Sequence, residues 1–125
     1  MKKSMLLALL VAVVAMVAVP VLAQDPVKVD PKHYKVEFEN DQVRVLRVSY
    51  GPGEKSVMHE HPDAVATFLA DAKGRFNMPD GSKQDFDNKK GSVLWTPAGK
   101  HLPENTSDKA FELILVELKS KPAAH

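Results

Sequence analysis

Short runs in which apolar and polar residues alternate follow one another along most of the chain. Residues 34–38 carry apolar side chains at every second position, and residues 43–50 continue the pattern. Further short runs rich in Val, Leu, Phe and Thr extend to residues 110–118. A period of two is typical of strands with one buried face. No stretch of helical length after residue 23 keeps a helical period, so the pattern predicts an all-β domain.

Turn-forming residues separate these runs. Four clusters stand between them: Asn40-Asp41, Gly51-Pro52-Gly53, Pro79-Asp80-Gly81 and Pro97-Ala98-Gly99. Many short strands with a turn after each are typical of an antiparallel barrel or sandwich. We therefore predict a small antiparallel β-barrel or sandwich over residues 33–118. A proline-containing arm, residues 24–32, precedes it, and a polar tail, residues 119–125, follows it.

Residues 1–23 have the pattern of an export signal. Lys2 and Lys3 precede an unbroken apolar run from Met5 to Val19, and Val21-Leu22-Ala23 matches a cleavage site with small residues at −3 and −1. An uncleaved membrane anchor is the alternative, because such a run approaches the roughly 20 residues that span a bilayer. Pro20 and the cleavage pattern favour a cleaved signal. We therefore expect a periplasmic or secreted protein with no membrane contact after cleavage.

Charge and composition exclude several classes of function. Removing 23 of the 125 residues leaves 102, enough for a single core. The formal charge changes from +1 to −1, because Lys2 and Lys3 are lost. A near-neutral domain lacks the concentrated positive charge of a nucleic-acid binder, so no nucleic-acid partner is expected. The absence of cysteine excludes disulfides, zinc–thiolate sites, iron–sulfur clusters and thiol nucleophiles.

Three histidines carry the candidate chemistry. His59-Glu60-His61 places two imidazoles two residues apart, which on a strand puts them on one face and Glu60 on the other. His101 follows a Pro-Ala-Gly turn, from which a returning strand can bring a third imidazole. Imidazole nitrogen binds zinc, copper, iron and nickel. A metal site and a metal-free pocket formed by the same three residues remain the two interpretations.

The spacing around these histidines resembles the two motifs of the cupin superfamily. The matching segments are Gly53-x5-His59-x-His61 and Gly91-x5-Pro97-x-Gly99-x-His101-x3-Asn105. The second has one residue, where the family has two, between Gly99 and His101. The resemblance covers nearly all of the chain after residue 23. It implies an all-β fold, the small antiparallel β-barrel or jelly roll known as the double-stranded β-helix. It also implies a divalent ion (zinc, iron, copper or nickel) in the barrel mouth, bound by His59, His61 and His101.

One part of the family pattern is missing. In the first motif, three or four residues normally separate the second histidine from a glutamate, and this chain has Val65 or Ala66 at that position. Counting back from Gly74 gives Thr67, which is not a carboxylate either. The resemblance therefore implies a site of three histidines, more open to water or substrate and with the ion's charge nearly undiminished. Thr67 offers a nearby hydroxyl if it faces inward.

Two functions follow from the resemblance. One is an exported metal-dependent enzyme, of dioxygenase-like or isomerase type, acting on a small chelating metabolite. The other is a non-catalytic module that binds a small ligand, with or without metal, since fold alone does not decide between them. The family often dimerises through strand edges, so a homodimer is also implied. We interpret His33 and His125 as surface histidines, and Asn105 as a structural hydrogen-bonding residue.

Overall fold

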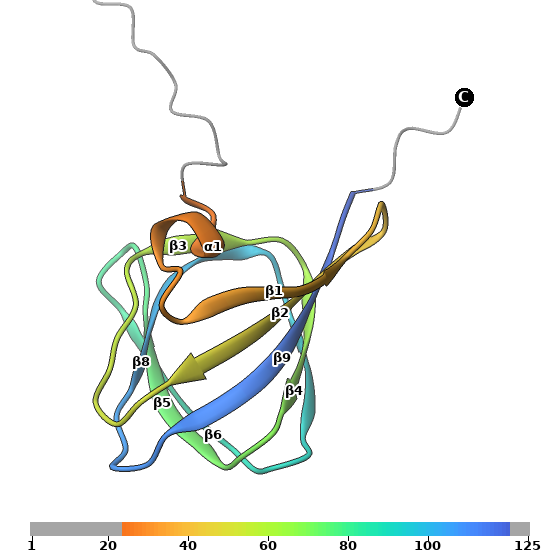
Figure 1. The fold of residues 1–125 in the computed structure, drawn as a ribbon. Coiled ribbons are helices and arrows are strands. Elements are labelled where there is room, and N and C mark those ends of the chain that lie inside the picture. Colours follow the sequence, from red (N-terminus) through yellow and green to blue (C-terminus); the bar gives the residue numbers. More distant parts are fainter. Residues whose placement is uncertain (1–23, 121–125) are drawn as a thin grey trace, which may run out of the picture.

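The computed structural model describes residues 24–120. The predicted signal, residues 1–23, and residues 121–125 of the predicted tail lie outside them. The described part contains one helical turn and nine strands (Figure 1): α1 (Pro26–Val29), β1 (Tyr34–Glu39), β2 (Val43–Tyr50), β3 (His59–His61), β4 (Ala64–Phe68), β5 (Ala72–Asn77), β6 (Lys83–Asn88), β7 (Val93–Thr96), β8 (Gly99–Asn105) and β9 (Phe111–Leu118). The prediction of an all-β domain is confirmed.

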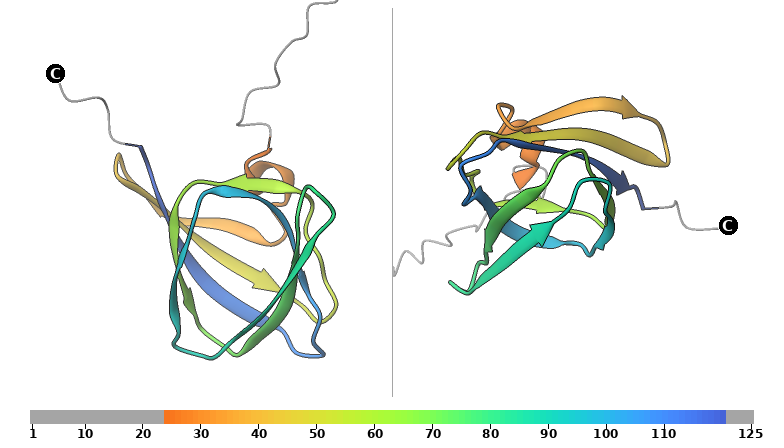
Figure 2. Two further views of the ribbon diagram at one scale, coloured as in Figure 1. Left: turned by 180° about the vertical axis from the view of Figure 1, so that it is seen from behind. Right: turned by 90° about the horizontal axis from the view of Figure 1, so that it is seen from below.

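The strands form two antiparallel sheets that face each other. One sheet has the order β1-β2-β9-β4-β7, and the other has the order β3-β8-β5-β6. The two further views show the sheets as opposite walls of a short barrel (Figure 2). Chain neighbours such as β3 and β4 lie in different sheets, so the chain passes repeatedly from one wall to the other.

The core lies between the walls and follows the alternation read from the sequence. On β2, Leu46, Val48 and Tyr50 are buried, while the residues between them are half-buried. On β9, Phe111 and Leu115 point the same way and pack into the same cluster. Burial of these side chains stabilises the barrel, because each removes a large apolar surface from water.

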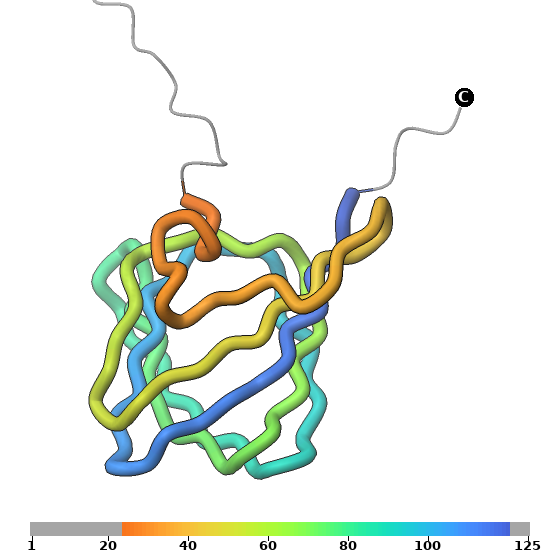
Figure 3. The backbone as a smooth tube through the Cα atoms, viewed as in Figure 1, coloured from red at the N-terminus to blue at the C-terminus, as the bar shows by residue number. Residues whose placement is uncertain are grey.

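The five-stranded sheet has open edges at β1 and β7. A register shift between Val36 and Phe38 interrupts the pairing of β1 with β2, and both side chains are exposed. The β1–β2 hairpin extends beyond the barrel together with the end of β9 (Figure 3), where the Lys119 amide donates to the Gln42 carbonyl. The homodimer expected through strand edges stays a prediction.

The N-terminal arm contains the helical turn α1, which lies against β3 at one end of the barrel (Figure 1). Asp25 caps this turn by accepting from the Val27 amide at 3.0 Å, and Pro26 stands at its start. A single turn is too short to leave a period in the sequence, so the pattern did not predict it. Within residues 24–120, no helix is long and apolar enough to cross a membrane.

Two strand glycines should respond differently to substitution by alanine. At Gly74, an added Cβ would overlap the Glu104 carbonyl oxygen and the Phe86 ring, whereas at Gly99 it would meet nothing within 4 Å. We expect Gly74→Ala to lower the free energy of unfolding by about 1–3 kcal/mol. Gly99→Ala should change it by less than about 0.5 kcal/mol. Urea unfolding followed by circular dichroism measures both, and equal effects would contradict the packing described here.

Candidate metal centre

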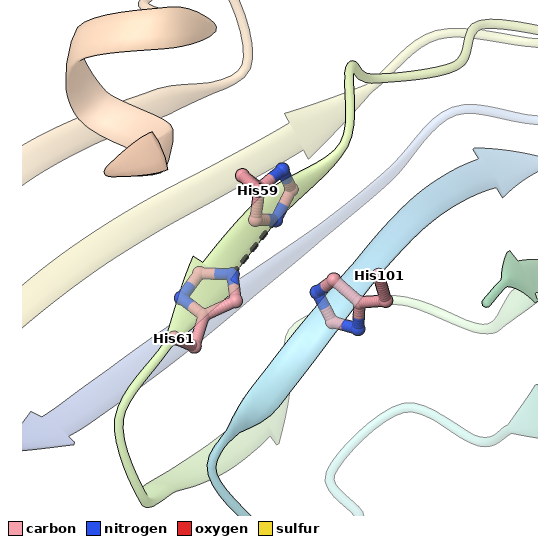
Figure 4. Close-up of side chains that lie close together, drawn as sticks. All are labelled: His59, His61 and His101. Carbon is pink, nitrogen blue, oxygen red and sulfur yellow. Dashed lines mark hydrogen bonds between the residues drawn. The ribbon is translucent and has the colours of Figure 1, made fainter. Parts of the chain in front are cut away.

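The structure brings the three predicted histidines together. His59 and His61 lie on β3 with both side chains buried, and Glu60 between them faces the other way. His101 lies on β8 directly opposite His59 in the antiparallel register. The candidate ligand atoms of the three residues lie within 4.8 Å of one another (Figure 4). A later strand, β8, therefore returns to the histidine pair, as expected.

Hydrogen bonds fix the ring orientation of His59. Its Nδ1–H donates to the Val57 carbonyl at 2.8 Å, and the Ser56 Oγ lies 3.2 Å from the same nitrogen. The Ser56 hydroxyl in turn donates to Asp30 at 2.5 Å. Because Nδ1 carries the hydrogen, Nε2 of the neutral ring has a free lone pair, and it points toward His61.

A buried carboxylate fixes His61 in the same way. The Nδ1–H of His61 donates to Glu117 Oε2 at 2.6 Å, and Glu117 is only 2% exposed. The other oxygen, Oε1, accepts from Arg44 Nε at 2.7 Å. A carboxylate behind an imidazole is the usual partner of a metal-binding histidine, since it fixes the tautomer and makes the free nitrogen more basic.

The two free nitrogens face each other. Nε2 of His59 and Nε2 of His61 are 2.9 Å apart (Figure 4), a separation at which two lone pairs repel unless a proton or a cation lies between them. Two nitrogens that bind one ion at about 2.0–2.1 Å and at right angles are about 2.9 Å apart. The observed spacing therefore suits adjacent positions around a transition-metal ion.

His101 completes the set with an unpaired buried nitrogen. Its ring stacks on Phe76 with the ring centroids 4.8 Å apart and the planes 4° from parallel. Its Nε2 is buried and has no hydrogen-bond partner within residues 24–120. An unpaired buried polar atom is costly, and a bound cation would satisfy it. The three imidazoles therefore fit a divalent ion.

The protonation of two rings favours the same conclusion. Burial and the neighbouring His61 lower the pKa of His59 to about 4. Burial and the two other imidazoles lower the pKa of His101 to about 3. Both rings are therefore neutral near pH 7, which is the form that binds a metal.

The β4 strand leaves the site open where the family has a glutamate. Ala66 is buried and lines the cavity beside the histidines, whereas Thr67 alternates to the other face of the strand. The contact of the Thr67 hydroxyl with the site depended on an inward orientation, and period-two alternation directs this side chain outward instead. Glu117 is a buried carboxylate close to the centre, but it contacts the outer nitrogen of His61.

A cavity of about 470 Å³ lies between the sheets and reaches the centre through His61 and His101. Its wall is largely apolar and aromatic, and includes Phe68, Phe76, Phe86, Trp95 and Phe111. No aspartate or glutamate is among the lining residues in the described part of the chain. The size and the apolar wall are typical of a site for a small organic ligand.

Several residues near the site were missed or misread from the sequence. His33 was expected at the surface but is 5% exposed, because its ring lies between Asp30 (2.7 Å) and Glu54 (3.1 Å) and stacks on Tyr50. Glu117 was not singled out, although it continues the inward-facing alternation of β9. That alternation was the available signal.

Asn105 has the structural role that was expected. Its Nδ2 donates to the carbonyls of Gly51 and Lys109, and its Oδ1 accepts from the Ser107 amide. It therefore ties the loop before β9 to the turn after β2. His125 lies outside the described residues.

Comparison with known proteins identifies the fold. No protein-family model matches the chain, and no curated protein matches it by sequence. A cupin domain from Bordetella pertussis matches with a TM-score of 0.65 and 25% identity, over 70% of this chain and 92% of that one. A cupin superfamily protein from Desulfitobacterium hafniense matches with a TM-score of 0.53 and 20% identity, over 70% and 76%.

The polyketide cyclase RemF from Streptomyces resistomycificus also matches, with a TM-score of 0.54 and 12% identity over 72% of this chain and 66% of that one. At that identity the likeness concerns the fold alone. Together, the sheet order, the histidine-bearing strands and these matches define a cupin fold, the double-stranded β-helix. The chain therefore has a cupin fold and a candidate three-histidine metal site, as its two motifs predicted.

The metal-free protein should lose stability as the pH falls from 7 to 5. The pKa values of His59 and His101 lie below the ordinary value of 6.5 that these groups regain on unfolding. The unfolded chain therefore takes up protons first, and stability declines through this window. Urea midpoints in EDTA at stepped pH measure the decline. His101→Gln should make it shallower, and an unchanged slope would contradict the neutral state assigned to His101.

Proposed function

We propose that this chain is an exported, metal-dependent cupin enzyme of oxygenase or isomerase type that acts on a small, largely apolar metabolite. The proposed ligands of the divalent ion are His59, His61 and His101. The single observation that carries the proposal is the convergence of their ring nitrogens. Two face each other at 2.9 Å, and the third is buried without a hydrogen-bond partner among residues 24–120. Residues 1–23, with their export pattern, support a periplasmic or secreted location.

The donor set leaves several classes of ion open. Three neutral imidazoles suit zinc, iron, copper or nickel, and the described residues place no thiolate or carboxylate among the ligand atoms. When bound, such an ion supplies Lewis acidity and, for a redox-active metal, the ability to activate dioxygen. The chain itself contributes the fixed orientation of the rings, through Val57 and Glu117, and an apolar enclosure that limits access of water.

The cavity suggests the type of metabolite. An apolar wall of aromatic side chains favours a planar or branched hydrocarbon body. Because the described lining contains no acidic residue, an anionic oxygen group near His61 and His101 would not contact a carboxylate of the cavity wall. A compound with an apolar body and one chelating oxygen group therefore suits both ends of the cavity. The same features also suit a ligand-binding module without turnover, which is the second candidate.

Metal content is the first test of the proposal. The protein purified without a tag should carry about one equivalent of a transition metal per chain, and His59→Ala/His61→Ala should carry almost none. His125→Gln serves as the histidine control and should keep the metal. Elemental analysis after loading with zinc, iron, copper or nickel measures the ratio. No bound metal in the unsubstituted protein would exclude the metalloenzyme and favour the binding module.

Introducing a carboxylate on β4 should strengthen metal binding and weaken binding of an organic ligand in the cavity. We expect Ala66→Glu to bind Zn²⁺ at least about tenfold more tightly. Residues that only hydrogen-bond to metal ligands already change metal affinity by about tenfold or more, and a new ligand should do at least as much. Its affinity for catechol, a chelating probe with an apolar ring, should fall because the new side chain enters the cavity. Thr67→Glu, one residue away but facing outward, should change neither affinity. Isothermal titration measures both, and equal behaviour of the two variants would contradict the assigned orientation.

A further inference from the structure

The two ends of the N-terminal helical turn are connected to two different histidines of the metal centre. Asp25 stands at the N-terminal cap of α1, and Asp30 stands at its C-terminal cap. Each carboxylate begins a chain of hydrogen bonds that leads into the barrel. The first chain ends at His61 and the second at His59, whose rings project from β3 (Figure 4).

The first chain passes through a pair of oppositely charged side chains. Arg44 donates from both terminal nitrogens to Asp25, at 2.7 and 2.9 Å, and from Nε to Glu117 at 2.7 Å. Glu117 accepts from His61 with its other oxygen. Burial works against the charge on Arg44, but the hydrogen bonds to both carboxylates outweigh it and raise the pKa of Arg44. The guanidinium therefore stays charged and holds both acids in place.

The second chain is shorter and more deeply buried. Asp30 accepts from the Ser56 hydroxyl at 2.5 Å and from His33 Nδ1 at 2.7 Å, and its side chain is nearly inaccessible. Ser56 lies 3.2 Å from Nδ1 of His59. The arm thus contributes one carboxylate to each chain of hydrogen bonds. Asp25 is connected to His61 through Arg44 and Glu117, and Asp30 is connected to His59 through Ser56.

These carboxylates matter more here because β4 provides none. A divalent ion bound by three neutral imidazoles keeps its full charge. The nearest compensation is Glu117, directly behind His61, and Asp30, which lies behind Ser56 and His59. Glu117 lies one imidazole away from the ion's position, on β9, while Ala66 stands where a ligand carboxylate would be expected. Asp25 and Glu117 also line a hollow of about 560 Å³ beside the arm, so the contact between arm and barrel has solvent on one side.

We propose that Glu117, Asp25 and Asp30 are positioning residues for the metal ligands, so that metal binding and docking of the N-terminal arm stabilise each other. This inference rests on the proposed metal site. Thermodynamic reciprocity requires that if the docked arm strengthens binding of the ion, the ion strengthens docking of the arm by the same factor.

Metal affinity provides the first test. Glu117→Gln keeps the size of the side chain and removes its charge, and it should weaken binding of Zn²⁺ by about 10- to 100-fold. Asp25→Asn retains a good helix cap but removes the charge that Arg44 binds, so its effect should be smaller, about 2- to 30-fold. Glu112→Gln is the control, because Glu112 lies on the same strand and accepts from Ser49, outside both chains of hydrogen bonds.

Hydrogen exchange of α1 provides the second test, because a merely structural role of Asp25 would not make it depend on metal. The amides of Lys28, Val29 and Asp30 donate within the turn to Asp25 and Pro26. Saturating Zn²⁺ should slow their exchange in the unsubstituted protein, and less so in Asp25→Asn. The Gly81 amide, in the turn between β5 and β6, should not respond.

The outcomes separate this inference from the proposed function. If the unsubstituted protein binds no Zn²⁺, the metal site itself is wrong. The coupling to the arm is wrong under a different pair of results. In these, Glu117→Gln and Asp25→Asn bind Zn²⁺ as tightly as the unsubstituted protein, and hydrogen exchange of the α1 amides is the same with and without Zn²⁺. Circular dichroism of each metal-free variant verifies folding, and the absorption spectrum of bound Co²⁺ reports any change in ligand geometry even where affinity is retained.

Discussion

The carboxylate of Glu117 is buried on the inner face of the barrel, and much of the surrounding structure is arranged to satisfy it. Burial of a charge is tolerated only with charged or strongly polar partners on each oxygen. Arg44, directly across the β2–β9 pairing, supplies one partner, and His61 from the opposite sheet supplies the other. One side chain therefore joins the two walls of the barrel and fixes the ring that faces His59.

The remainder of the interior is divided between two environments. At one end, buried polar groups are paired in networks that run from α1 to the histidines. Toward the middle, aromatic and aliphatic residues surround a cavity with no acidic side chain in its described lining. Such a division places a ligand's polar group at the imidazoles and its apolar body away from them. The small Ala66 at the boundary leaves this approach open.

Local alternation predicted the strands, because it depends on residues that lie close together in the chain, and on β2 and β9 it reveals the buried faces directly. The histidine cluster joins distant parts of the chain, and it was the resemblance of the two motifs to a known family that implied that His101 joins His59 and His61. Long-range partners were harder to recognise. His33 resembles a surface histidine until Asp30 and Glu54 are seen on either side of it. The orientation of Thr67 was left open, because the count of positions did not establish which face of β4 it occupies.

Trp95 is the only tryptophan in the sequence, and it lines the cavity from the edge strand β7 while 57% of it remains exposed. An indole in contact with both water and a binding cavity changes its emission when the polarity around it changes. The protein therefore carries an intrinsic optical reporter of cavity occupancy, at a single known position. Compounds can be screened by fluorescence alone, before any reaction is known and without attaching a dye.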